Sequence, residues 1–99
     1  MRYQFEWDPE KERVNIRNHG VSFRRAATVF QDPYQLSVYD LNHSTQEDRW
    51  ITLGLDLNGV PRVVVHTYKE DSSEICTIRI ISARKATRNE MRDYERRVP

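Results

Sequence analysis

The sequence lacks the features that mark several common classes of protein. It has one cysteine, Cys76, so no disulfide can form within the chain, and we interpret this residue as a small buried side chain in a strand. No apolar run approaches the roughly 20 residues that span a bilayer, and the N-terminus has no apolar stretch typical of a signal peptide. We therefore expect a cytoplasmic protein with no membrane partner.

Glycine and histidine are too scattered to indicate a nucleotide or metal site. The three glycines stand at positions 20, 54 and 59, which argues against a glycine-rich loop that binds nucleotide phosphates. The three histidines, His19, His43 and His66, fall at a helix end, in a loop and in a strand. They lack the close ligand pairs of zinc or iron sites, so we expect no metal and no cofactor.

The composition suits one small domain, and its charge is unevenly distributed. The chain has 99 residues, of which 37% are hydrophobic and 31% charged, and we expect a single domain over residues 1–99. Residues 79–99 carry seven Lys or Arg against three Asp or Glu, a net charge of +4, whereas residues 1–78 carry nine against twelve, a net charge of −3. Local positive charge attracts polyphosphates, although a solvated terminal helix would have the same composition.

Hydrophobic periodicity predicts a strand and two helices in the first third of the chain. Residues 3–7 alternate apolar and polar side chains, as in a half-buried strand. A helix is expected from Pro9 to about Asn18, capped by Asp8 and stopped by Gly20. A second helix should begin at Ser22 and carry an apolar stripe through residue 30.

The rest of the chain predicts strands followed by a helix. Extended segments are expected at 36–40, 51–57, 62–69 and 75–82, with Asn58-Gly59 as a two-residue hairpin turn and a polar loop over 43–48. Thr87 and Glu90 match a capping box that would begin the last helix, with Tyr94 on its apolar side. The expected fold is α+β, with three or four antiparallel strands and the helices on one face of the sheet.

Cations in and after the last strand are the first candidate for a functional site. Arg79 stands between Ile78 and Ile80, and a cation inside a core strand needs a partner or a cleft for its head group. One interpretation is a structural pair between Arg79 and a carboxylate. The other is that Arg79, with Arg84 and Lys85, binds a phosphodiester on the open face of the sheet.

Glu47, Arg49 and Trp50 form a second candidate. A carboxylate, a guanidinium and a large aromatic suit proton transfer, phosphate neutralisation and base stacking. A surface ion pair beside a core tryptophan would account for them equally well.

Five short blocks of the sequence occur in an order that matches a known family. They are Phe5-Glu6-Trp7-Asp8-Pro9; Asn15 with His19-Gly20-Val21-Ser22-Phe23; Val29-Phe30 with Asp32-Pro33; Glu47 with Arg49-Trp50 and Gly54; and Arg79-Ile80-Ile81-Ser82-Ala83-Arg84. From Phe5 to about Tyr94 the chain resembles the BrnT family, the ribonuclease toxins of bacterial type II toxin-antitoxin systems.

The resemblance implies a RelE-like fold and an endoribonuclease that needs no metal and inhibits translation. It also implies that a BrnA-like antitoxin with a ribbon-helix-helix region neutralises the protein. Operator DNA would be bound only through this antitoxin. Two positions depart from the family pattern: Asn18 stands where a Lys is frequent, and Lys69 where an Arg is frequent. Both substitutions change cation geometry.

From these observations we assign expected roles to nine residues. Glu47 would be the general base in the attack of a ribose 2′-hydroxyl on the adjacent phosphate, with His19 as the alternative base. Arg49, Arg79 and Arg84 would bind and neutralise the phosphate. The residues expected to contact RNA are Lys85, Trp50, Tyr68 and Arg88. A non-catalytic RNA-binding or protein-interaction module on the same scaffold remains the alternative, and the basic face could equally receive an acidic or amphipathic antitoxin segment.

Overall fold

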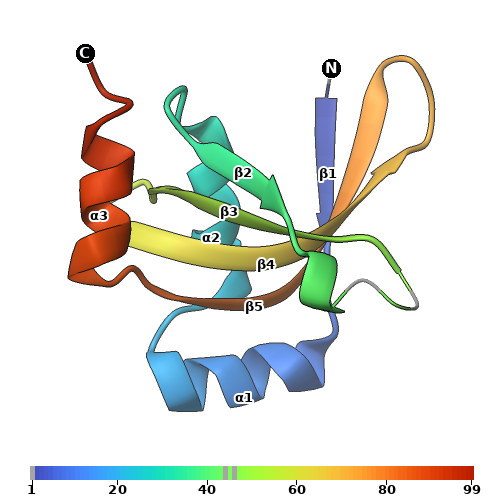
Figure 1. The fold of residues 1–99 in the computed structure, drawn as a ribbon. Helices are drawn as coiled ribbons and strands as arrows, with labels where there is room; N and C mark the ends of the chain where they lie inside the picture. The colour runs from blue at the N-terminus through green and yellow to red at the C-terminus, as the bar shows by residue number, and fades with distance from the viewer. Residues whose placement is uncertain (1, 44, 46) are drawn as a thin grey trace.

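The computed structural model describes residues 2–43, 45 and 47–99, which form a five-stranded sheet with helices on both faces and along one edge (Figure 1). The strand order is β1-β5-β4-β3-β2. Strands β2 to β5 pair antiparallel, whereas β1 pairs parallel with β5. The elements are β1 (Arg2–Glu6), α1 (Pro9–His19), α2 (Phe23–Ala27), η1 (Thr28–Gln31), β2 (Leu36–Tyr39), η2 (Leu41–His43), β3 (Arg49–Leu55), β4 (Pro61–Glu70), β5 (Ile75–Lys85) and α3 (Arg88–Glu95).

The predicted α+β class is confirmed, and several boundaries differ. The second helix leaves the α conformation after Ala27 and continues as a 3-10 turn, η1. Strand β3 ends at Leu55, so Leu57, expected on its apolar face, is 74% exposed. The connection to β4 spans residues 56–60 rather than a two-residue turn, because Asp56 folds it with its own side chain: the carboxylate accepts from the amides of Asn58 and Val60.

Helix α1 covers the part of β5 that β1 does not reach. Asp8 caps the helix at its start, and Gly20 ends it in the left-handed conformation with φ 68°, as predicted. Strand β1 pairs with β5 only as far as Arg79. Beyond that point the buried side chain of Asn15 takes the place of a strand: it accepts from the amide of Ala83 at 3.1 Å and donates to the Ala83 carbonyl at 2.9 Å.

Both faces of the sheet carry apolar residues, and helices cover each of them in part. Ile78, Ile80 and Val64 pack beneath α2 and η1, where Gly54 leaves room for the side chain of Val29. On the opposite face, Leu53 and Val63 pack against Tyr94 of α3. The expectation that all helices lie on one face is wrong, because β3 and β4 present apolar side chains in both directions.

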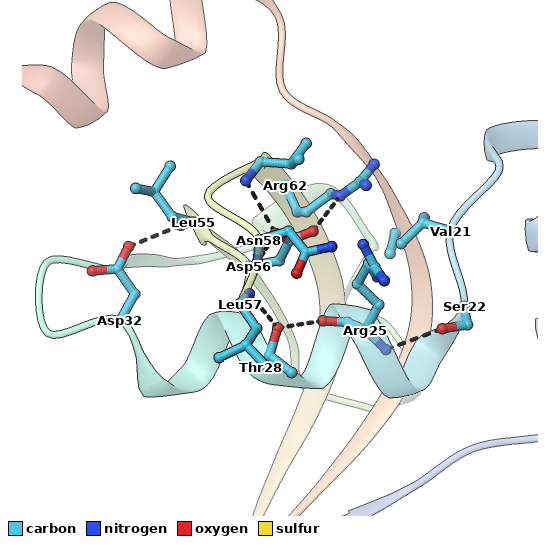
Figure 2. A network of polar contacts seen from close by, with 12 residues as sticks. Val21, Ser22, Arg25, Thr28, Asp32, Leu55, Asp56, Leu57, Asn58 and Arg62 are labelled. Atoms are coloured by element: carbon cyan, nitrogen blue, oxygen red, sulfur yellow. Dashed lines mark hydrogen bonds and ion pairs between the residues drawn. The ribbon is translucent and has the colours of Figure 1, made fainter.

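Hydrogen bonds tie these layers together at the β3–β4 loop. The hydroxyl of Thr28 accepts from the amide of Leu57 at 2.8 Å, and Asp56 holds Arg62 at 3.1 Å (Figure 2). The carboxylate of Asp32 accepts from the amide of Leu55 at 2.8 Å and from the hydroxyl of Tyr94 at 2.6 Å. This end of the sheet is therefore fixed, and the candidate site lies at the other end.

Candidate functional site

Four residues line up across four neighbouring strands on the face opposite α2. Arg49 of β3 is in register with Thr67 of β4, Thr67 with Arg79 of β5, and Arg79 with Glu6 of β1. Registered residues point to the same face of a sheet, so this row lies on the side that also carries Leu53. We call the surface formed by Glu47, Arg49, Thr67 and Arg79 the basic face.

Glu47 stands between the two arginines of the basic face. Its Oε2 accepts a hydrogen bond from Arg79 Nη2, and its Oε1 lies 3.6 Å from Arg49 Nε. The side chains of Arg49, Arg79 and Glu47 are 31%, 34% and 38% exposed, respectively. Glu47 and the two guanidinium groups sum to +1, and the exposed Glu6 at the end of the row adds a second carboxylate. An anionic ligand would therefore be held by the N–H donors of Arg49 and Arg79 rather than by the net charge.

His19 lines a cavity of about 320 Å³ between α1 and β5. The cavity is also lined by Lys11 and Ser82. Ser82 is in register with Val65, two positions from Thr67 along β4, which places it on the basic face at roughly 7 Å from the row.

The cavity is lined by none of Glu47, Arg49 and Arg79. His19 lies one turn of α1 beyond Asn15, which bonds to Ala83, so the structure does not bring the alternative base to Glu47.

Arg84, Lys85 and Arg88 do not join Glu47. Arg84 donates two hydrogen bonds to Glu90, at 2.8 and 2.9 Å, and these bonds lower the pKa of the Glu90 carboxyl to about 2. Glu90 also completes the predicted capping box with Thr87, so Arg84 serves the start of α3. Lys85 is in register with Arg62 on the face that bears Val64, and Arg88 is exposed in the first turn of α3.

Trp50 and Tyr68 lie on the other face of the sheet from Arg49 and Arg79. Strand alternation sends Trp50 away from its neighbour Arg49, and Trp50 is in register with His66. Trp50 and Tyr68 line a cleft of about 530 Å³ there, together with Asp48 and Glu70. The stacking residues and the phosphate-binding residues predicted for one site are therefore separated by the thickness of the sheet.

His66, which the sequence placed only in a strand, is a buried structural residue. Its Nε2 lies 2.6 Å from the hydroxyl of Thr52, which in turn lies 2.6 Å from that of Ser37. Burial lowers the pKa of His66 to about 4, so the ring is neutral near pH 7. No pattern in the sequence predicted this series of polar contacts, because its three members come from three different strands.

Two further observations bear on the class of protein. In residues 2–43, 45 and 47–99, no three His, Cys, Asp or Glu side chains gather in a group that could hold a metal ion. Within the same residues, no helix is both long and apolar enough to cross a bilayer.

Comparisons with known proteins identify the family. Residues 7–90 match a protein family that is described as the ribonuclease toxin BrnT of type II toxin-antitoxin systems. The crystal structure of the Brucella abortus ribonuclease toxin BrnT is similar, with a TM-score of 0.56 and 22% sequence identity over 89% of this chain and 100% of that chain. No curated protein matches. The chain therefore belongs to the BrnT family of ribonuclease toxins of type II toxin-antitoxin systems.

Proposed function

We propose that this chain is a metal-independent endoribonuclease whose active site is the basic face. The observation that carries the proposal is the placement of Glu47 between Arg49 and Arg79, partly exposed to solvent. Strand-embedded arginines on an open face suit the binding of a phosphodiester, and they supply positive charge where a metal ion would otherwise be needed.

The mechanism is an attack of a ribose 2′-hydroxyl on the adjacent phosphorus. Glu47 takes the proton of the hydroxyl, the new P–O bond forms a 2′,3′-cyclic phosphate, and the bond to the 5′-oxygen breaks. The leaving oxygen takes up a proton from water, and His19 remains the alternative base. Arg49 and Arg79 each have five N–H donors, so they can hold Glu47 and the phosphate oxygens together while negative charge builds up.

The family places this chemistry in a toxin-antitoxin setting. A type II toxin has a protein antitoxin, and we propose a BrnA-like one with a ribbon-helix-helix region that alone contacts operator DNA. Cleavage of RNA in the cytoplasm would inhibit translation, and the sheet with its helices would be a RelE-like scaffold. Growth arrest on expression, relieved by the co-expressed antitoxin, tests this setting.

The test of the active site compares Arg79→Ala and Arg49→Ala with Arg96→Ala on total RNA in the presence of EDTA. Arg96 is an exposed cation on a distant helix end and serves as the matched control. Loss of a preorganised charge in an active site costs on the order of 10²-fold or more in rate, so the first two variants should be impaired and the control should not. Wild-type rates in both would reject the site, and complete inhibition by EDTA would reject metal independence.

A non-catalytic RNA-binding module is favoured by one observation, the occupation of both Glu47 oxygens by arginines. A protein of this kind would bind RNA through Arg49 and Arg79 and leave it intact. Filter binding alongside the cleavage assay separates the two functions.

A further inference from the structure

The cleft on the face opposite Glu47 has aromatic walls. It is lined by the rings of Tyr3, Trp50 and Tyr68, with Ser37 beside them. Trp50 and Tyr68 meet edge to face, with ring centroids 6.1 Å apart, and Tyr39 meets Trp50 in the same way at 5.3 Å. Burial and the neighbouring Tyr3 raise the pKa of Tyr68 to about 12, so this wall is a neutral phenol.

The charge of the cleft is negative. Asp48 and Glu70 contribute carboxylates, and none of the described residues that line the cleft is Lys or Arg. Asp48 accepts a hydrogen bond from the hydroxyl of Tyr39 at 2.7 Å, which fixes it against the aromatic group. Aromatic faces combined with carboxylates bind guanidinium and ammonium groups, whereas the same carboxylates repel the phosphates of RNA. The cleft therefore suits a cationic side chain.

Strand β2, next to the cleft, has an unprotected edge. It is the last strand of the sheet, and residues 36–39 include no charged residue and no proline, the usual protection of an edge strand. The amide of Asp40 donates to the carbonyl of Arg49, so Val38 and Leu36 also bond to β3. The backbone groups of Ser37 and Tyr39 then point outward, where a further strand could bond to them.

We propose that an extended segment of a partner protein pairs with β2 and inserts an arginine or lysine side chain into this cleft. A residue placed opposite Ser37 in an added strand points to the same face as Ser37 itself, which lines the cleft. In a type II system, the partner that we propose for this cleft is the antitoxin. The proposal therefore depends on membership of the family and does not depend on whether the protein cleaves RNA.

The probe is an acetylated pentapeptide with a central arginine between valines and threonines. Its binding to the full chain is followed by the NMR signal of the Trp50 indole, with the Trp7 indole as the internal reference. We expect the Trp50 signal to shift. A peptide with neutral citrulline in place of arginine should bind at least about tenfold more weakly, and a peptide with N-methylated amides on the edge facing β2 should lose binding similarly.

Variants of the protein complete the test. Asp48→Asn with Glu70→Gln should weaken binding of the arginine peptide about tenfold, whereas Asp93→Asn, which removes an exposed carboxylate of α3, should not. Thermal unfolding of each variant shows whether it is folded. Equal affinity for the citrulline peptide, or no shift of the Trp50 signal, would overturn the proposal. A Trp50 shift with an oligoribonucleotide would assign the cleft to RNA, and a free chain that is dimeric through β2 would assign it to a second copy.

Discussion

Residues 47–50 supply two sites of opposite character, one on each face of the sheet. Glu47 and Arg49 turn to the side of Arg79, where two guanidinium groups flank the carboxylate of Glu47. Asp48 and Trp50 turn to the other side, into an aromatic cleft with two carboxylates. Glu47, Arg49 and Trp50, which suggest one RNA site in the sequence, therefore separate into a candidate catalytic site and a candidate partner site.

The two faces are also anchored differently. Under the aromatic cleft, a buried chain of hydroxyls and imidazole joins Ser37, Thr52 and His66. On the side of the sheet that carries Arg79, but away from Glu47, an ion pair between Arg84 and Glu90 holds the start of α3. The anchor of one face is neutral and buried, whereas that of the other is charged and partly exposed, so the two should respond differently to mutation and to pH.

The largest expected effect is on the basic face. Glu47→Gln keeps the shape of the side chain and removes its capacity to take a proton, so RNA cleavage should fall on the order of 10²-fold to 10⁴-fold. Cleavage rates of folded protein on total RNA measure this. If Glu47→Gln is active and His19→Gln is not, the imidazole is the base and Glu47 only orients the arginines.

The next largest effect should come from the edge of β5, the strand that presents Arg79. Asn15→Ala leaves the amide and carbonyl of Ala83 without their partner, at a cost of about 3 kcal/mol in the free energy of unfolding. Chemical denaturation measures it. Asn18→Ala on the same helix changes an exposed residue and should stay within about 0.5 kcal/mol of the wild type; equal losses in both variants would contradict the role of Asn15.

An effect of similar size, which depends on pH, is expected from His66 under the aromatic cleft. The pKa of His66 is lowered to about 4 in the folded protein, from 6.5 in the unfolded chain. The unfolded state therefore binds the extra proton first, and stability falls by up to about 3 kcal/mol as the pH drops from 6.5 to 4. The denaturation midpoint of His66→Gln should change less with pH across this range than that of the wild type. A parallel pH profile in both proteins would show that His66 does not titrate in this way.

The smallest effect belongs to the ion pair between Arg84 and Glu90 and appears at lower pH. Hydrogen bonds from Arg84 lower the pKa of Glu90 to about 2 from 4.5, so its contribution is complete above pH 4.5 and disappears toward pH 2. Because both side chains are partly exposed, we expect on the order of 1 kcal/mol. The stability difference between wild type and Glu90→Gln should shrink across that window, and a difference that is constant with pH would contradict the ion pair.

Local rules predicted the elements well. Caps and stops at Asp8, Gly20 and Thr87 are set by neighbours in sequence, and these predictions are confirmed. The parallel pairing of β1 and the split of helices between two faces depend on contacts between distant segments, which periodicity does not report.

The candidate site was predictable only in part. Glu47 and Arg79, 32 positions apart, do lie together, as the joint order of short blocks suggested. Arg84 does not join them, because its partner Glu90 is six residues away in the next helix. Trp50 was assigned to the same surface as Arg49 although side chains alternate along a strand, so this error could have been avoided from the sequence. The facing of Tyr68 relative to Arg49 is known only once the register of β3 and β4 is fixed.

The central claim, that cleavage takes place on the basic face, is tested most directly by the rate of RNA cleavage of Arg79→Ala measured beside Arg96→Ala. Both variants lose one positive charge, and only Arg79 contacts Glu47. The account predicts a loss on the order of 10²-fold or more for Arg79→Ala and a rate near the wild type for Arg96→Ala. Equal rates in the two variants would contradict it.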